Sequence, residues 1–587
     1  MKSYHLISCI LAALVFVSCT KTAEQEKPPN IVIILTDDQG WGDLSFHGNT
    51  NFHTPHIDSI ALQGCAVENF YVQPVCSPTR AELLTGHYAS SLGVYATSAG
   101  GERMNLGIPT LAEIFREAGY TTGAFGKWHN GTQPPYHPNS RGFQEFYGFC
   151  SGHWGNYFSP MLEKNGAIIK GEGFLVDDLF NQAMSFIENQ KDPFLVYLPL
   201  NTPHSPMQSP DSFWESAKER TIKMTSDQEE DLNFTKAAIA MVENIDWNVG
   251  RFTNFLRTKQ LEDNTIVIFM SDNGPNGWRW NGQMKGKKGS TDEGGVKSPF
   301  FIKWPEKIKS STTSTQLMGS VDLLPTLVNL TSLPIPEGLT FHGKDLSSAF
   351  LESNDQDQPN VVYNHWNGKT SIRTGHYRLD DTNQLYNLKE DRGQTQDIGA
   401  LVPDIRDSLI QLKQTWRSTH NSAPELNPKR PFPIGDTLHG FAQLPARDGI
   451  AHGTILRSNR WPNDSFYTNW TKTTDSITWD VDVLNEGVFE VYLYYTCKPE
   501  DIGTTLSLSL NGNEIQRTIS EAHDPPLQGA SKDRYPRMEG YVKEFKPVKM
   551  GELTATKGLS TLSLKATSIP GTASIDFRLL YFKRKGS

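Results

Sequence analysis

Short, continuously apolar runs alternate with helical segments along the first half of the chain. Three such runs occupy residues 31–35, 194–198 and 266–270. Runs of this length are typical of strands whose two faces are both covered by helices. Residues 111–118 carry apolar side chains at helical spacing, and Thr110 lies where that helix is expected to begin. This order of strands and helices predicts an α/β domain built on a doubly wound, mostly parallel sheet.

Polar side chains follow each of the three apolar runs. They are Asp37 and Asp38 after the first run, His204 after the second, and Asp272 and Asn273 after the third. In sheets of this kind, ligands bind at the carboxyl ends of the strands. We therefore expect these five side chains to converge on one rim of the sheet, although they are far apart in the sequence.

The pattern changes twice in the second half of the chain. Residues 371–379 and 384–388 have the composition of short antiparallel strands. Beyond a Pro-rich junction the apolar positions alternate, as in residues 477–483 and 489–495, and residues 511–513 form a strong hairpin signal. The first pattern predicts a small antiparallel sheet, and the second predicts an appended all-β sandwich.

These patterns divide the chain into consecutive parts. The expected boundaries are 1–18 for a signal peptide, 19–29 for a tether, 30–355 for the α/β domain, 356–426 for the small antiparallel-sheet subdomain and 434–587 for the sandwich. The sandwich is compatible with two roles, a carbohydrate-binding module and a structural appendage. The two-residue period alone does not separate exposed aromatic residues from core ones.

The N-terminal residues are expected to be a targeting signal that is not part of the fold. Lys2 precedes an apolar run that is too short to span a bilayer, and Cys19 follows that run. The sequence before Cys19 resembles a bacterial lipobox, which implies cleavage there and lipidation of the thiol. The alternative is an ordinary secretory signal with an incidental cysteine. Both readings predict an exported protein of the periplasm or cell surface, and the first anchors it in a membrane at Cys19.

Charge and cysteine content exclude other classes of protein. The formal net charge is −10 and there is no long basic run, which argues against a nucleic-acid-binding protein. Of the six cysteines, Cys9 leaves with the signal and Cys19 lies at the cleavage site. The remaining four are too few for a disulfide framework in a chain of 587 residues, and no Cys-x-x-Cys pair suggests zinc.

Cys76 has the most informative surroundings of the four. It lies in residues 74–80, Pro-Val-Cys-Ser-Pro-Thr-Arg, which precede Leu-Leu-Thr-Gly at 83–86. A helix N-terminus and an arginine both favour anions, so this turn predicts an anion pocket, with a buried structural cysteine as the alternative. The segment resembles the Cys-x-Pro-x-Arg signature of the type I sulfatases of the alkaline phosphatase superfamily. That resemblance implies oxidation of Cys76 to formylglycine (3-oxoalanine) by a formylglycine-generating enzyme, with the aldehyde hydrate as the nucleophile.

Further segments extend the resemblance over residues 30–425. Residues 119–129 resemble the second sulfatase signature, apart from Phe125, where a smaller or β-branched residue is usual. We expect Lys127 and His129 to lie on one side of an extended segment. A lysine ammonium can neutralise a sulfate oxygen and a histidine can exchange a proton, although both residues would also be ordinary on a surface.

Two more segments supply a second histidine and a second lysine. Residues 201–206 resemble the family segment whose histidine contacts sulfate or protonates the leaving oxygen, which here is His204. Lys288 matches the family lysine that precedes a Glu-Gly-Gly sequence. Lys285 and Lys287 are close enough to leave this last assignment open.

The acidic pairs predict a site for a hard cation. Only oxygen ligands occur in them, from Asp37 with Asp38 and from Asp272 with Asn273. Oxygen ligands suit Ca²⁺ or Mg²⁺ rather than zinc, and adjacent carboxylates would repel each other without a metal. In the sulfatases these positions match the four protein ligands of one divalent ion, usually Ca²⁺, and the formylglycine from Cys76 adds an oxygen.

The resemblance implies hydrolysis of sulfate esters on a sulfated polysaccharide or oligosaccharide. In that mechanism Arg80 and the metal hold the formylglycine hydrate, while Lys127 and Lys288 balance charge on the sulfuryl oxygens. His204 protonates the departing sugar oxygen, and His129 takes a proton so that sulfate can leave. Two alternatives remain: a phosphonate or phosphodiester hydrolase with the same nucleophile, and a glycan-binding protein with an inactive catalytic domain.

Five further residues are expected to contact the sulfated glycan: Arg103, His153, Trp278, Arg279 and His365. The segments 153–157 and 278–281 combine aromatic rings with polar side chains, so they could stack against a sugar and hydrogen-bond it. The same aromatic residues would serve equally well in a hydrophobic core.

Overall fold

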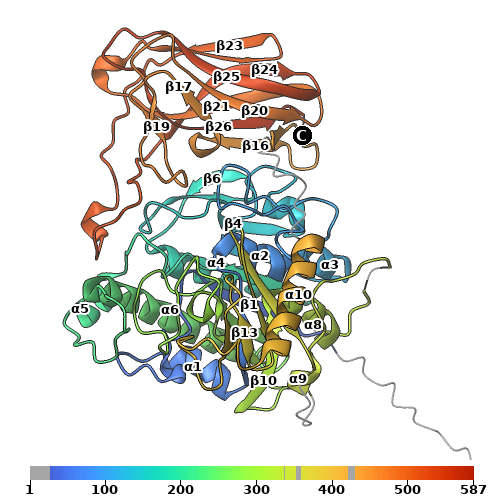
Figure 1. The fold of residues 1–587 in the computed structure, drawn as a ribbon. Coiled ribbons are helices and arrows are strands. Elements are labelled where there is room, and N and C mark those ends of the chain that lie inside the picture. The colour runs from blue at the N-terminus through green and yellow to red at the C-terminus, as the bar shows by residue number, and fades with distance from the viewer. Residues whose placement is uncertain (1–26, 336, 352–357, 421–429, 587) are drawn as a thin grey trace, which may run out of the picture.

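The computed structural model describes residues 27–335, 337–351, 358–420 and 430–586. The predicted signal peptide, the lipobox and most of the tether lie outside these ranges. Within them, no helix combines the length and the apolar character that a membrane span requires. Figure 1 shows the β-sandwich stacked on the larger α/β part of the molecule.

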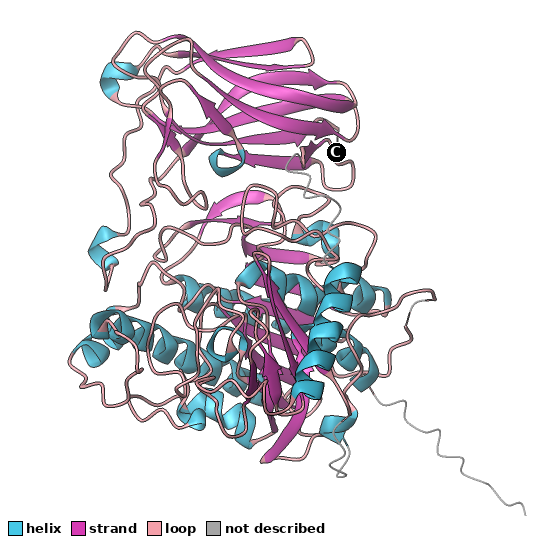
Figure 2. Ribbon diagram, viewed as in Figure 1, coloured by secondary structure: helices cyan, strands magenta, loops and turns pink. Residues whose placement is uncertain are grey.

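The α/β part contains one sheet of ten described strands (Figures 1 and 2). β1 (Asn30–Thr36) pairs in parallel with β7 (Phe194–Pro199) on one side and β8 (Thr265–Ser271) on the other, as the apolar runs predict. The order is β10 (Thr312–Gly319), β2 (Cys65–Tyr71), β9 (Phe300–Lys303), β8, β1, β7, β3 (Thr121–Lys127), β4 (Glu145–Phe149), β5 (Met161–Lys164) and β6 (Ala167–Lys170). Of these strands, β9, β5 and β6 pair antiparallel. The predicted doubly wound, mostly parallel α/β sheet is therefore confirmed.

Alternate side chains of β1 enter two different cores. Ile31 and Ile33 pack on one face of the sheet, and Val32 and Ile34 pack on the other. The first face is covered by α2 (Cys76–Thr85), α3 (Leu111–Glu117) and α8 (Leu323–Leu330), and the second by α1 (Pro55–Leu62), α4 (Leu175–Glu188) and α6 (Leu232–Thr258). Burial on both faces explains why the strand is apolar at every one of these positions.

The predicted start of α3 is confirmed by its cap. The Thr110 hydroxyl accepts a hydrogen bond from the Glu113 N–H at 3.3 Å, and the Glu113 carboxylate accepts one from the Thr110 N–H at 2.7 Å. This reciprocal pair is a capping box. Shorter helical segments in the described residues are α5 (Asp211–Lys218), α7 (Glu293–Val296), α9 (Ser348–Leu351) and the 3₁₀ turns η1 (Ser45–His47), η2 (Pro138–Arg141), η3 (Ser320–Asp322), η4 (Ala446–Asp448), η5 (Pro499–Asp501) and η6 (Ala530–Lys532).

The small antiparallel sheet is present where the sequence places it. Its strands are β11 (Val361–Trp366), β12 (Lys369–Thr374), β13 (Tyr377–Leu379) and β14 (Leu385–Asn387). A helix that the sequence analysis did not predict, α10 (Pro403–His420), packs Leu409 against Ile372 and Leu379 of this sheet.

The C-terminal part is a sandwich of two sheets, as the alternating pattern predicts. One contains β15 (Phe432–Ile434), β20 (Ser476–Val483), β25 (Gly558–Ser568), β22 (Thr505–Leu510), β23 (Asn513–Thr518) and β17 (Ile450–His452). The other contains β18 (Leu456–Arg457), β19 (Tyr467–Thr468), β26 (Asp576–Arg584), β21 (Gly487–Thr496), β24 (Lys546–Ala555) and β16 (Phe441–Pro445). Inward residues of both sheets, such as Trp479 and Phe577, form one hydrophobic core.

Glu82 makes the stability of the α/β core depend on pH. Its carboxylate lies in α2, is 2% exposed, and accepts hydrogen bonds from Gln73, Ala89 and Ser320. Burial raises the pKa of Glu82 to about 7, from 4.5 for the free side chain. Consider a carboxyl group whose pKa is higher in the folded protein than in the unfolded chain. Its contribution to stability is fully present at pH values below its pKa in the unfolded chain. That stability is lost as the pH rises through the folded pKa.

We expect Glu82→Gln to remove this dependence. Between pH 4.5 and pH 7, the free energy of unfolding of the wild type should fall by about 3 kcal/mol relative to the variant. Chemical denaturation of both proteins across this pH range measures the difference. A difference that does not vary with pH would contradict the raised pKa.

Candidate active site

The carboxyl ends of β1 and β8 bring the four predicted metal ligands together. Asp37 and Asp38 follow β1, Asp272 and Asn273 follow β8, and all four are buried. The Asp38 N–H donates to Asp272 Oδ1 at 3.2 Å, and Asn273 Nδ2 donates to Asp38 Oδ1 at 2.8 Å. Because β1 and β8 are parallel neighbours, their ends meet at the same edge of the sheet.

Three basic side chains neutralise this acidic cluster. The ion pairs are Arg80 with Asp272, Lys127 with Asp37 and Lys288 with Asp38, each with a nitrogen–oxygen distance of 2.7 Å. Burial alone would raise the pKa of Asp38, but attraction to Lys288 and His204 outweighs it and holds that pKa well below its usual range. We define the catalytic cluster as these three ion pairs together with Cys76 and Asn273. Its members are Asp37, Asp38, Cys76, Arg80, Lys127, Asp272, Asn273 and Lys288.

Lys288 is the lysine of its segment that reaches the cluster. Lys285 pairs instead with Asp292 at 3.7 Å, and the Lys287 ammonium lies 4.8 Å from the centre of the Trp278 ring. The geometry therefore identifies Lys288, rather than Lys285 or Lys287, as the lysine that contacts the cluster. Spacing alone did not distinguish the three.

The cluster fits a divalent cation. Among the residues described, Asp37 Oδ1 and Asn273 Oδ1 are buried oxygen atoms without a hydrogen-bond partner. Ligand atoms of Asp37, Cys76 and Asp272 all lie within 4.8 Å of one another. Burial, followed by the charge of Asp37, raises the pKa of Asp272 to about 6. A cation with oxygen ligands would satisfy both unpaired atoms and relieve this repulsion, which suits Ca²⁺ or Mg²⁺.

Cys76 is the first residue of α2 and faces the same cluster. Two hydrogen bonds fix the helix there: Thr79 donates to the Asp272 carbonyl at 2.6 Å, and Arg80 to the Lys127 carbonyl at 2.8 Å. Cys76 is 3% exposed, and burial raises the pKa of its thiol, although the Lys127 ammonium opposes the shift. The unmodified thiol is therefore protonated at neutral pH and is a weak nucleophile.

His129 lies beyond the end of β3, but not on an extended segment. Its φ is +64°, so the expectation that Lys127 and His129 share one side of an extended chain is wrong. Its Nε2 lies 2.9 Å from the Thr97 carbonyl and so carries the proton. Burial, followed by the Lys127 charge, lowers the pKa of His129 well below 6.5, so the ring is neutral. Nδ1 is buried, has no partner in the described part of the chain, and can accept a proton.

His204 lies on the more open side of the cluster. Its side chain is 11% exposed and that of Lys288 is 17% exposed, against 1% for Asp38. Its Nδ1 lies 2.6 Å from the Ser205 carbonyl and its Nε2 lies 3.8 Å from Asp38 Oδ2. Burial and the Lys288 charge lower the pKa of His204 to about 4. The His153 ring stacks beside it, with centroids 5.9 Å apart.

Two arginines that the sequence assigns to the substrate have structural partners instead. Arg279 is 5% exposed, and its guanidinium binds the Asp43 carboxylate at 2.7 Å and the Asp38 carbonyl at 2.8 Å. Arg103 is 2% exposed and donates to the carbonyl of Pro431 at 2.8 Å. Their charges hold the chain in place, and this burial argues against contact of either residue with a substrate.

Trp278 and His365 occupy less central places. Trp278 is half-buried beneath Lys287. His365 Nδ1 lies 2.7 Å from the Thr370 hydroxyl, and its ring lines a separate cavity of about 440 Å³ together with Pro78. Contact of these two residues with a substrate stays a prediction.

The sequence analysis missed residues on both sides of the cluster. Asn201 and Thr202 follow β7 and have buried polar side-chain atoms without a described partner, so the strand-end argument could have found them. Asn463 and Glu539 come from the sandwich and approach His129 and His204, respectively. No sequence pattern linked them to residues more than 300 positions away.

Family models match the part of the chain that carries this cluster. The model Sulfatase matches residues 29–333, and the model N-sulphoglucosamine sulphohydrolase, C-terminal, matches residues 287–402. N-acetylgalactosamine-6-sulfatase of Rattus norvegicus is 30% identical over 415 residues, which cover 64% of this chain and 75% of that protein. Arylsulfatase A of Homo sapiens is 30% identical over 397 residues, which cover 60% of this chain and 74% of that protein.

A solved structure has the same fold. The crystal structure of Ps i-CgsB in complex with k-i-k-neocarrahexaose gives a TM-score of 0.62 at 29% identity, covering 69% of this chain and 96% of that chain. The fold is that of the alkaline phosphatase superfamily, whose members are built on this type of sheet. Within that class, the chain belongs to the sulfatase family and is a sulfuric ester hydrolase. Both matching family models end before the sandwich begins.

Proposed function

We propose that this sulfatase removes sulfate from a sulfated polysaccharide or oligosaccharide, using formylglycine derived from Cys76 and a bound Ca²⁺ ion. The position of Cys76 carries the proposal. Its sulfur lies at the N-terminus of α2, within 4.8 Å of ligand atoms of Asp37 and Asp272. A helix N-terminus and the surrounding cations favour an anionic substrate at this point.

The modified residue and the ion would supply what the thiol lacks. When present, the formylglycine hydrate would provide an oxygen nucleophile, and the cation, held by Asp37, Asp38, Asp272 and Asn273, would stabilise negative charge. A formylglycine-generating enzyme would be required for maturation.

The side chains of the cluster would position the ester and move its protons. Lys127 and Lys288 would neutralise the sulfuryl oxygens, and Arg80 would hold the nucleophilic residue through its place on α2. His204 borders the open side, so it would meet the departing sugar oxygen and donate a proton to it. Its pKa of about 4 would rise beside an anionic sulfate ester. His129 would accept a proton at Nδ1, whose lone pair is free.

Two relatives support a glycan substrate. The rat relative is named for N-acetylgalactosamine 6-sulfate, and Ps i-CgsB was crystallised with a neocarrahexaose. Both matches lie at about 30% identity and span most of the relative's length. A sulfated sugar is therefore the substrate class that we propose for this chain.

Sulfate release from a defined panel tests the proposal. Protein matured with a formylglycine-generating enzyme should release sulfate from an aryl sulfate and from sulfated oligosaccharides. It should act more slowly on an aryl phosphate or a phosphodiester. Removing the metal with a chelator should abolish the activity, and adding Ca²⁺ should restore it. A clear preference for the phosphodiester would overturn the proposal.

A further inference from the structure

Two segments of the sandwich leave its sheets and reach the α/β domain. The first joins β18 to β19, and the second joins β23 to β24. Figure 1 shows the second segment descending from the sandwich toward α5. We call residues 458–463 and 537–541 of these segments the sandwich rim.

The second segment is fixed along the part of the chain that carries His204. Gln208 Nε2 donates to Asp533 at 2.9 Å, and the Tyr535 hydroxyl donates to Asp231 at the start of α6 at 2.5 Å. These hydrogen bonds place the rim residues that follow beside residues 203–208.

Glu539 of the rim lies next to His204. The Ser205 hydroxyl donates a hydrogen bond to the Glu539 carboxylate, and Ser205 directly follows His204 in the chain. Arg537 of the same segment donates to the Gly155 carbonyl at 2.5 Å, close to His153 in the sequence. The rim therefore borders the more open side of the catalytic cluster, where His204 and Lys288 are partly accessible.

Asn463 of the rim lies next to His129. Its Nδ2 donates to the Thr97 carbonyl at 3.3 Å, and His129 Nε2 contacts the same carbonyl at 2.9 Å. A Cβ atom added to Gly152 would lie 2.5 Å from both nitrogens. A side chain at residue 152 would therefore clash with both side chains unless they moved, so a glycine suits this position.

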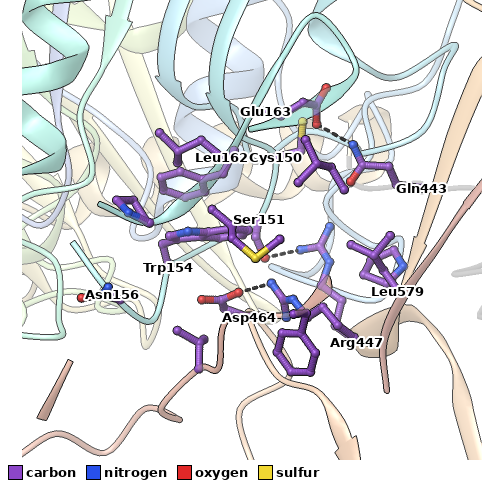
Figure 3. Close-up of a pocket in the computed structure, with 18 of the residues that line it drawn as sticks. Cys150, Ser151, Trp154, Asn156, Leu162, Glu163, Gln443, Arg447, Asp464 and Leu579 are labelled. Carbon is purple, nitrogen blue, oxygen red and sulfur yellow. Dashed lines mark hydrogen bonds and ion pairs between the residues drawn. The ribbon is translucent and has the colours of Figure 1, made fainter. Parts of the chain in front are cut away.

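Buried polar contacts hold the rim in this position. Arg447 of the sandwich is 4% exposed and donates to Asn463 at 2.9 Å. It also donates to Ser151 at 2.9 Å (Figure 3). Asp464 accepts from the Gly155 N–H at 2.5 Å. The cavity in Figure 3, about 80 Å³, lies at the same junction, and its described lining includes no member of the catalytic cluster. These contacts set the rim at a fixed place beside the cluster.

Trp461 and Arg460 are exposed residues of the rim, as is Met538. Trp461 is 46% exposed, and the Arg460 guanidinium lies 4.8 Å from the centre of its ring. Exposed aromatic rings stack on sugars, and arginine pairs with sulfate and carboxylate groups. An aromatic ring beside a cation, two residues from Asn463, is chemically suited to a sulfated glycan.

We propose that the sandwich rim is part of the substrate-binding site. Trp461 and Arg460 would bind the sugar units that are linked to the sugar carrying the scissile sulfate. This inference rests on the proposed function and adds a role for the sandwich domain. A glycan bound at His204 would continue past Glu539 and reach the exposed ring. An aryl sulfate is too short to extend beyond the cluster.

The test compares two tryptophan variants of the full-length protein. Trp461→Ala should lower kcat/KM for a sulfated tetrasaccharide about tenfold relative to kcat/KM for an aryl sulfate. The loss should appear mainly as a higher KM for the tetrasaccharide. The probes are chondroitin 6-sulfate and carrageenan tetrasaccharides. Trp247→Ala is the matched control, because Trp247 on α6 is 43% exposed and the Arg251 guanidinium lies 4.6 Å from its ring centre. Equal ratios of these two kcat/KM values in the two variants would overturn the proposal.

A binding measurement separates this inference from the proposed activity. Titration calorimetry with the same tetrasaccharides uses Cys76→Ala protein, which cannot turn them over. Adding Trp461→Ala should weaken binding by about tenfold and adding Trp247→Ala should not. Equal affinities would overturn the role of the rim even if the wild type releases sulfate. If the wild type releases none, the proposed function fails, while the calorimetric difference still decides on the rim.

Discussion

Cys76→Ala is expected to abolish sulfate release and to leave the fold intact. The substitution removes the thiol whose oxidation would convert Cβ into the aldehyde of formylglycine, while the metal ligands and basic residues stay in place. We expect kcat/KM for an aryl sulfate to fall by at least about 10⁴-fold, as for the loss of a nucleophile in other hydrolases. The lost sulfur leaves a small cavity at the N-terminus of α2, so the stability cost should be about 1 kcal/mol.

Cys65→Ala is the matched control for this loss. Cys65 is also a buried thiol, in β2 of the same sheet, and burial raises its pKa as it does for Cys76. The control variant should retain its sulfate release. Turnover by folded Cys76→Ala protein at the wild-type rate would refute the assignment of the nucleophile. Peptide mass spectrometry of the wild type provides an independent check, because residue 76 should carry the aldehyde.

Asp272→Asn is expected to remove the metal and the activity together. The variant retains the size of the side chain but withdraws a carboxylate from the proposed cation site, so elemental analysis should find much less bound Ca²⁺. We expect aryl sulfate hydrolysis to fall by about 10³-fold. Arg80 is fully buried and pairs with Asp272 at 2.7 Å, so the variant leaves a buried cation without its partner. That loss should lower the free energy of unfolding by about 3–5 kcal/mol.

Glu293→Gln separates the loss of metal from the loss of stability. Glu293 is 1% exposed and its carboxylate pairs with the buried Arg378 at 3.1 Å, outside the catalytic cluster. This control should also unfold more easily, yet it should retain its Ca²⁺. A folded Asp272→Asn protein with the full wild-type Ca²⁺ content would show that Asp272 is not a ligand.

The acidic half of the catalytic cluster could be predicted from a simple rule, whereas Cys76, Arg80, Lys127 and Lys288 were identified by the resemblance to the sulfatases. Asp37 and Asp272 each end an apolar run, and parallel neighbouring strands bring such ends together without any further information. The rule does not apply to residues whose backbone dihedral angles differ from those of a regular strand. His129 has a left-handed φ, so a period of two gave the wrong orientation relative to Lys127.

Pairing between distant residues was not visible in the sequence. Arg103 and Arg279 were expected to contact the substrate, and that expectation stays a prediction. Their actual partners, Pro431 and Asp43, are far away in the sequence and leave no periodic signal. The same applies to the sandwich rim, because a two-residue period predicts a sheet but not the domain against which its loops pack.

The place of β1 in the sheet would help the enzyme to retain the proposed cation. This strand is hydrogen-bonded on both edges and packed on both faces, so it belongs to the part of a protein that opens only when the whole domain unfolds. Asp37 and Asp38 continue directly from it. Fluctuations of surface loops therefore do not disperse the Asp37 and Asp38 carboxylates, so a cation bound to them would be held by the most stable part of the domain.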